Sequence, residues 1–208
     1  MNHHMLRLAR LAGLSVALAM ALAAGAVAPA QAGAGPRVTP CVLPDGLDPY
    51  VPGGTVLQDF YGVSASIVTG FCPTIKAGAR WTVVAAAYFA ETWEAIPPGY
   101  TPVSATPVGD FRARFVGIKI VVDEGTPHEF TVEWANSPKL WVGDYGPYVL
   151  ANPITLGTVR PLSVGVHSER VVYVMSGVVC DGLTTDPDLS CIPPGETSFN
   201  TRYFTVVP

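Results

Sequence analysis

Charged side chains and histidines are scarce in this 208-residue chain, and their scarcity excludes several classes of function. Charged residues make up 13% of the chain, Lys and Arg together number 12, and there are four histidines. A protein that binds nucleic acid needs clustered cations to neutralise phosphates. The tightest grouping of cations is Arg112 with Arg114, which we place on one face of a strand. We therefore expect no nucleic-acid partner.

The sequence also lacks the short motifs that indicate catalysis or metal binding. No C-x-x-C pair and no H-E-x-x-H arrangement offers ligands for zinc. No G-x-S-x-G motif offers a serine nucleophile. We expect no cofactor, no metal and no enzymatic activity. The alternative is an extracellular hydrolase, because 16 Asp or Glu residues allow many carboxylate pairs that the sequence does not identify.

One long hydrophobic run is present, close to the first residue, and none of comparable length follows it. Arg7 and Arg10 precede residues 11–27, which carry no charge, and an A-x-A pattern ends at Ala32. This order is typical of a Sec signal peptide. A transmembrane anchor, the alternative, needs about 20 apolar residues, whereas this run has 17. We expect residues 1–32 to be cleaved and the mature protein to be secreted, extracellular and not inserted in a membrane.

The expected mature protein, residues 33–208, is acidic and long enough for one hydrophobic core. It keeps 16 Asp or Glu but 10 Lys or Arg, because Arg7 and Arg10 leave with the signal peptide. A chain of this size buries about 70% of its unfolded surface, so we expect a single domain. The alternative is two subdomains divided near residues 97–107, which contain four prolines.

The four cysteines are even in number and belong to a chain that we expect to be exported. Disulfides persist in oxidising compartments, so we expect all four thiols to be paired. Three connectivities exist, and proximity in the sequence favours Cys41 with Cys72 and Cys180 with Cys191. Each bond would stabilise the fold by about 2–4 kcal/mol, mainly by constraining the unfolded chain.

Proline and glycine clusters interrupt the chain, and short runs rich in Val, Ile, Thr, Tyr and Phe lie between them. This pattern is typical of all-β proteins, since few segments are long enough for a helix. We therefore expect an antiparallel β-sandwich with little helix. It resembles the immunoglobulin-like architecture in a generic sense, without a clear copy of the Cys, Trp and Cys arrangement of true immunoglobulin domains.

Residues 129–134 form the clearest expected strand, because apolar and polar residues alternate along it. Residues 116–122 precede it, and the short loop between the two predicts a hairpin. The polar face changes side near Gly117, which predicts a β-bulge there. The other expected strands are residues 38–42, 62–69, 81–95, 148–151, 153–160, 170–179 and 198–206.

Two of these strands require a choice. Residues 81–95 are rich in alanine, which favours a helix, but they also contain Thr, Val and aromatic residues, which favour a strand. We prefer the strand because the surrounding pattern is all-β. In residues 198–206, the alternation predicts that Arg202 faces solvent and Tyr203 faces the core.

Two histidines follow the expected signal peptide, and each has a nearby carboxylate. His128 adjoins Glu129, and His167 lies two residues before Glu169. Such pairs could supply a general base and the group that orients it. Both histidines border turns, however, where a solvated structural role is the simpler interpretation, and we prefer it.

The segment between Cys180 and Cys191 contains three carboxylates. Asp181, Asp186 and Asp188 could gather oxygen ligands of the kind that calcium prefers. The spacing does not match an EF-hand loop, and Asp, Gly and Pro are also the ordinary residues of turns. We therefore favour a loop without a metal.

The candidate ligand-binding residues are Trp141, Asp144, Tyr145 and Tyr148. Aromatic faces next to hydrogen-bonding groups suit a glycan or a protein partner. The alternative is that Trp141 and Tyr148 belong to the core of two strands, with Tyr145 alone outside. The leading functional hypothesis is a non-catalytic binding module for a protein or glycan. A structural envelope protein is a further alternative, and the sequence does not indicate the oligomeric state.

Overall fold

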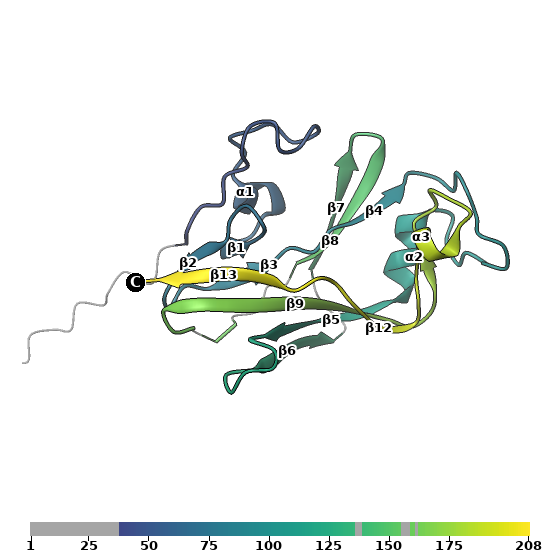
Figure 1. Cartoon of the computed structure of the whole chain (residues 1–208). Coiled ribbons are helices and arrows are strands. Elements are labelled where there is room, and N and C mark those ends of the chain that lie inside the picture. The colour runs from purple at the N-terminus through teal and green to yellow at the C-terminus, as the bar shows by residue number, and fades with distance from the viewer. Residues whose placement is uncertain (1–37, 136–138, 155–158, 161) are drawn as a thin grey trace, which may run out of the picture. The chain divides into compact units, whose positions relative to one another are not determined.

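The computed structural model describes residues 38–135, 139–154, 159–160 and 162–208. The expected signal peptide, residues 1–32, therefore lies outside the described residues. The described elements belong to the unit formed by residues 34–208. Most of them are strands arranged in several sheets, with little helix, as the sequence predicts (Figure 1).

The large sheet is built around one long strand, β9, which spans Gly165–Met175. Its order is β2-β13-β9-β5-β6, and β12 also pairs with β9. Alternate residues of β9 are buried along much of its length, which places one face of the sheet against the core. The other strands are β2 (Thr74–Lys76), β5 (Phe115–Val122), β6 (Phe130–Ala135), β12 (Gly195–Ser198) and β13 (Arg202–Val207).

The expected hairpin and its bulge are confirmed. Strands β5 and β6 pair antiparallel, from Gly117 with Ala135 to Val122 with Phe130. The register between β5 and β9 shifts between Phe115 and Gly117, which leaves one extra residue on β5. The bulge explains why the polar face of this segment changes side in the sequence.

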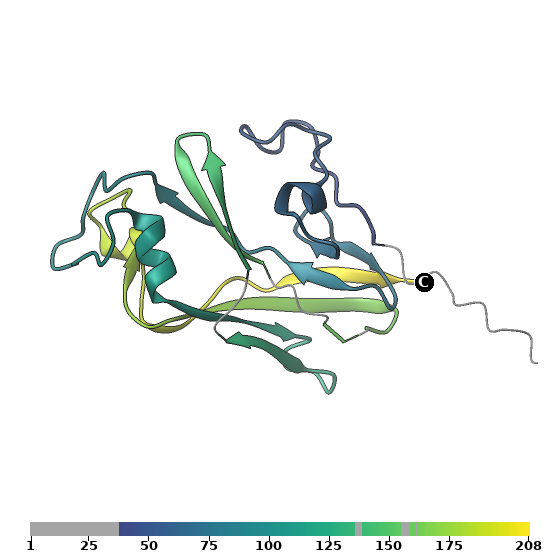
Figure 2. The same ribbon diagram turned by 180° about the vertical axis from the view of Figure 1, so that it is seen from behind.

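The small sheet contains β4 (Ala87–Ala90), β8 (Tyr148–Ile154) and β7 (Lys139–Tyr145), in that order. Strands β7 and β8 form an antiparallel hairpin that turns at Gly146, whose φ of 61° is easily adopted by glycine. The hairpin and helix α1 (Leu57–Tyr61) lie on the same side of the large sheet (Figures 1 and 2).

The expectation of a purely antiparallel arrangement is wrong, because two strand pairs are parallel. Strand β1 (Ser66–Val68) pairs parallel with β3 (Trp81–Val83), and β2 pairs parallel with β13. Parallel neighbours need a crossover of about a dozen residues or more. Residues 69–80 supply one between β1 and β3, and β2 and β13 lie far apart in the sequence.

Several expected boundaries also change. The expected strand 81–95 is present as β3 and β4, separated by a short break. The expected strand 62–69 is limited to β1, because Gly62 caps α1 with a φ of 63°. The expected strand 198–206 divides into β12 and β13. Part of the expected strand 153–160, residues 155–158, lies outside the described residues.

Helix α2 (Pro107–Arg114) occupies a segment for which the sequence predicts loop and strand. Arg112 and Arg114 are therefore on a helix and not on one face of a strand. The side chain of Thr106 accepts a hydrogen bond from the Gly109 amide, and Pro107 follows at the first helical position. Both features favour a helix start. None of the helices in the described ranges is long and apolar enough to cross a membrane.

The core consists of two apolar clusters. The larger lies on the inner face of the large sheet and contains fully buried aromatic residues, among them Trp81, Phe89, Phe111, Tyr173 and Phe204. The smaller joins the segment before α1 to β1 and the small sheet; it includes Leu43, Leu57, Ile67, Tyr145 and Leu150. Buried aromatic rings contribute much of the apolar area that stabilises a core of this kind.

Candidate functional site: an aromatic cleft

A cleft of about 680 Å³ opens between the segment around α1, the small sheet and one part of the large sheet. Its floor is aliphatic and includes Val84, Leu150 and Val171, which come from the end of β3, from β8 and from β9. These three side chains are also buried in the protein core. The floor therefore belongs to the folded framework and does not depend on a loop.

Aromatic rings form the walls of the cleft. They are Phe60, Tyr61, Phe71, Tyr88, Tyr145 and Phe199, which come from segments spread over most of the described chain. Tyr145 contacts Tyr50 and Tyr88, with ring centroids 4.9 and 5.4 Å apart. Trp141, which is not part of the lining, packs against Phe60 with ring centroids 4.9 Å apart. These contacts hold the wall rings in fixed orientations.

The structure separates the four residues that the sequence proposes as a ligand surface. Tyr145 is buried and lines the cleft, so the alternative in which it lies alone outside is wrong. Trp141 contacts Phe60, and Tyr148 contacts Tyr88 with ring centroids 6.5 Å apart, so each packs against a lining residue. Asp144 is exposed and is not part of the lining. Tyr145 belongs to the site directly, and the two other aromatics support it.

Arg202 is a cation at the edge of this largely apolar cleft, and the sequence alternation assigns it to solvent. In β13, Arg202 lies opposite Glu169 of β9 and shares its face with Phe204, which is buried. Tyr203 takes the outer face and is 70% exposed. The expected orientation of this segment is therefore inverted. The cause is the break between β12 and β13, which resets the alternation.

Glu169 forms an ion pair with Arg202 beneath the cleft. The Nε of Arg202 donates to Oε1 of Glu169, whose side chain is fully buried. Among the described residues, Oε2 of Glu169 has no hydrogen-bond partner. Burial raises the pKa of Glu169, and the charge of Arg202 opposes this shift. The carboxylate is therefore poorly solvated and held by one contact.

Asp48 brings a carboxylate to the cleft from the segment before α1. Its Oδ1 accepts hydrogen bonds from the backbone amides of Tyr50 and Val51, at 2.8 and 2.9 Å. Burial raises the pKa of Tyr88, and the nearby charge of Asp48 raises it further. Asp48 thus orders its own loop, and its charge adds to the effect of burial on the pKa of Tyr88.

The two histidines do not contribute to the cleft. His167 is buried, with Nδ1 2.7 Å from Oδ2 of Asp123 and Nε2 2.8 Å from the carbonyl oxygen of Ser163. Both ring nitrogens are occupied by oxygen partners, and Glu169 pairs with Arg202 instead. His128 is exposed in the β5–β6 turn, and its backbone amide donates to Thr126. His167 therefore offers no free base, and it is not the solvated residue that the sequence predicts. His128 is exposed, as expected, but lies outside the lining of the cleft.

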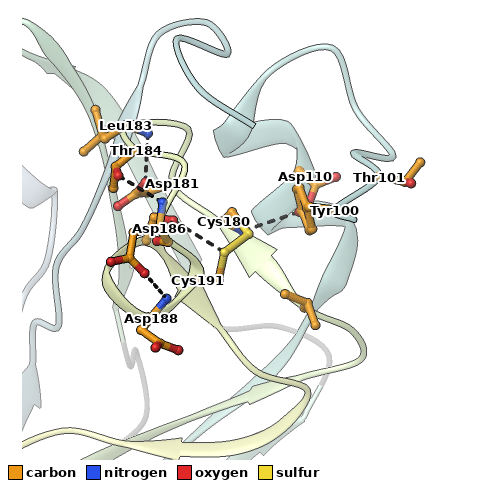
Figure 3. The surroundings of a disulfide bond; sticks show 12 residues. Tyr100, Thr101, Asp110, Cys180, Asp181, Leu183, Thr184, Asp186, Asp188 and Cys191 are labelled. Carbon is orange, nitrogen blue, oxygen red and sulfur yellow. Dashed lines mark hydrogen bonds between the residues drawn. A yellow bond between two sulfur atoms is a disulfide. The ribbon is translucent and has the colours of Figure 1, made fainter. Parts of the chain in front are cut away.

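The carboxylates of the 181–188 segment act as local hydrogen-bond acceptors (Figure 3). Asp181 accepts from the amide of Leu183 at 2.9 Å, and Asp186 accepts from the amide of Asp188 at 3.0 Å. The second bond caps helix α3 (Pro187–Ser190). Within the described ranges, no group of three or more His, Cys, Asp or Glu side chains is arranged to hold a metal ion.

Both disulfides join the cysteines that proximity favours. Cys41 is bonded to Cys72, and Cys180 to Cys191. The first fixes the segment before α1 to the β1–β2 connection, on the side of the cleft. The second joins the short strands β10 (Val179–Cys180) and β11 (Cys191–Ile192), close to Tyr100 and Asp110 (Figure 3).

Tyr100 and Asp110 form a polar network that connects α2 to the loop before it. Asp110 is fully buried and accepts from the Tyr100 hydroxyl and from the Val103 amide at 2.5 Å. Its Oδ2 also forms an ion pair with Nε of Arg114 at 3.3 Å. The hydroxyl of Tyr100 also accepts from the Cys180 amide at 3.4 Å. Burial and the Asp110 bond raise the pKa of Tyr100 to about 12.

This pKa predicts an alkaline loss of stability. The unfolded phenol ionises near pH ~10, so its stabilising contribution is complete below that pH and is lost as the pH rises through about 12. Tyr100→Phe should remove this dependence. Urea denaturation at about pH 8 and about pH 11 should show the wild type losing more stability than the variant between the two. Equal losses would contradict the assignment.

No protein-family model, no curated protein and no solved structure matches this chain. Function is therefore inferred from the cleft and from the residues that line it.

Proposed function

We propose that this protein is a non-catalytic, extracellular ligand-binding protein whose ligand occupies the aromatic cleft. The signal-peptide pattern of residues 1–32 and the two disulfides support a location outside the cytoplasm. The observation that carries the proposal is the cleft itself. Its volume of about 680 Å³ lies in the range of small-molecule sites, and its lining combines an aliphatic floor, aromatic walls and a few polar groups.

The lining narrows the class of ligand. Glycan sites use aromatic faces, but they also need many hydrogen-bonding groups for the sugar hydroxyls. Here the floor is aliphatic, and the polar side chains in the described lining are few. A small, largely apolar molecule, free or as part of a larger partner, fits this surface better than a bare glycan chain.

The lining also favours binding over hydrolysis. Glycoside hydrolysis requires two carboxyl groups on either side of the bond that is cleaved. Among the described residues that line the cleft, Asp48 is the single carboxylate, and its Oδ1 already binds two backbone amides. Glu169 is buried beneath Arg202 and outside the lining.

Filling the cleft should abolish binding without unfolding the protein. Ala86 lines the cleft and is exposed, so Ala86→Trp adds an indole ring at the site without disturbing the core. We expect the neutral fluorescent probe N-phenyl-1-naphthylamine to bind the wild type and to lose affinity about tenfold or more in the variant. The measurement is fluorescence titration.

The matched control is Ala105→Trp, since Ala105 is also exposed but lies outside the cleft. This variant should bind the probe as the wild type does. The proposed function fails if the wild type does not enhance the fluorescence of the probe, or if the two variants bind it equally.

A further inference from the structure

We propose that the cleft binds an amphiphile with an apolar body and a carboxylate head. This inference rests on the proposed function. The terminal guanidinium nitrogens of Arg202 bind the carboxylate head. The apolar body would lie on Val84, Leu150 and Val171, and between the aromatic walls.

The first argument is the position of Arg202. It lies on the inner face of the large sheet, in line with the buried Phe204, where apolar residues are the rule. Its side chain nevertheless remains 30% exposed, and Arg202 is one of the residues that line the cleft. A cation on an inner sheet face, opening into an apolar cleft, is the arrangement expected for the recognition of an anionic group.

The second argument is the unused hydrogen-bonding capacity of Arg202. A guanidinium group has five N–H donors in a planar fork. Nε donates to Glu169, but neither terminal nitrogen has a hydrogen-bond partner among the described residues. These two nitrogens form the edge that binds a carboxylate with two parallel hydrogen bonds. Glu169 does not occupy this edge, because its contact with Arg202 is made through Nε.

The third argument concerns charge. Glu169 is fully buried, and desolvation raises its pKa. Glu169 neutralises the charge of Arg202, but keeping its own buried carboxylate ionised costs free energy. A ligand carboxylate would supply a second counter-charge from the cleft side. The apolar walls exclude water and strengthen this attraction. Asn200, which also lines the cleft and lies two residues before Arg202, adds an amide donor next to the cation.

The test uses two ligands that differ mainly in the charge of the head. Dodecanoate and dodecanol are each titrated at neutral pH into the protein carrying bound N-phenyl-1-naphthylamine, and displacement of this probe measures the two affinities. We expect the wild type to prefer dodecanoate by about 10- to 100-fold, as for a charge-assisted hydrogen-bonded pair. Arg202→Gln should abolish the preference and leave the affinity for dodecanol within about threefold.

Glu169 supplies the matched variants. Glu169→Gln keeps the cation and should bind dodecanoate at least as tightly as the wild type. Arg202→Gln alone leaves a buried carboxylate unpaired and could unfold the protein. The double variant Arg202→Gln/Glu169→Gln removes both charges, so it should fold and should also lack the preference for dodecanoate.

The outcomes separate this inference from the proposed function. If the wild type binds the neutral probe and dodecanol but shows no preference for dodecanoate, the proposal of a carboxylate head is wrong, and the proposed binding function stands. Retention of the preference by the double variant would also overturn the role of Arg202. If neither the probe nor dodecanol binds the wild type, the proposed function itself fails.

Discussion

Replacing Asp110 by Ala should lower the free energy of unfolding by about 3–5 kcal/mol, one of the largest effects we expect from a single substitution. The carboxylate is fully buried, accepts from Tyr100 and Val103, and forms an ion pair with Arg114. Removing it leaves a hydroxyl and a backbone amide without their acceptor and Arg114 without its counter-charge. Urea denaturation followed by tryptophan fluorescence measures the loss.

Two variants define the cause of this loss. Asp144→Ala removes an exposed carboxylate and should change stability by less than about 0.5 kcal/mol. Asp110→Asn keeps one carbonyl acceptor but loses the charge, so its loss should be intermediate, at about 1–3 kcal/mol. If Asp110→Ala and Asp144→Ala lower the free energy of unfolding by the same amount, the network of Tyr100 and Asp110 does not stabilise the fold. Since Asp110 lies outside the cleft, binding of the neutral probe should persist wherever Asp110→Ala remains folded.

The parts of the fold that follow from local patterns are predictable from the sequence. The β5–β6 hairpin and its bulge near Gly117 both come from the alternation of apolar and polar residues, which depends on near neighbours alone. The mostly β character follows from the Pro and Gly punctuation. The disulfide pairs follow from sequence proximity, because a short separation lets two cysteines meet easily.

Alternation fails where the chain changes direction inside an expected strand. Residues 198–206 read as one strand, yet β12 ends at Ser198 and β13 begins at Arg202. The break shifts the alternation by one residue and moves Arg202 to the inner face. Helix α2 is a different case, because Thr106 and Pro107 do carry a helix-start signal. The interpretation of Arg112 and Arg114 as strand residues does not take this signal into account.

The cleft itself is not predictable from local patterns. Tyr88, Tyr145 and Arg202 line it together, but they lie on three strands in two sheets. Only tertiary packing brings them together. The sequence does identify the aromatic turn around Tyr145, because aromatic residues gather there locally. The sequence offers His167 as the near neighbour of Glu169, whereas the structure pairs Glu169 with Arg202, 33 residues away in the sequence.

Removing the Cys41–Cys72 disulfide should both destabilise the protein and weaken the cleft. The bond spans a sequence separation of 31 residues, for which the loss of loop-closure entropy predicts about 3–4 kcal/mol. Cys41 also packs against Leu43 and Leu57, which line the cleft, and its carbonyl accepts from the Leu57 amide at 2.8 Å. Without the bond, this wall is tethered by weaker contacts alone.

The matched comparison is the second disulfide, which spans a separation of 11 residues and lies beside α2 and α3. Cys180→Ala/Cys191→Ala should lower the free energy of unfolding by about 3 kcal/mol. Its affinity for N-phenyl-1-naphthylamine should stay within about twofold of the wild-type value. Cys41→Ala/Cys72→Ala should lower the free energy of unfolding slightly more. It should also weaken binding of the probe by about tenfold, because the segment before α1 gains conformational freedom that binding must remove. Urea denaturation and probe titration measure the two effects separately. If both double variants lose the same affinity, the Cys41–Cys72 bond stabilises the fold without positioning the cleft wall.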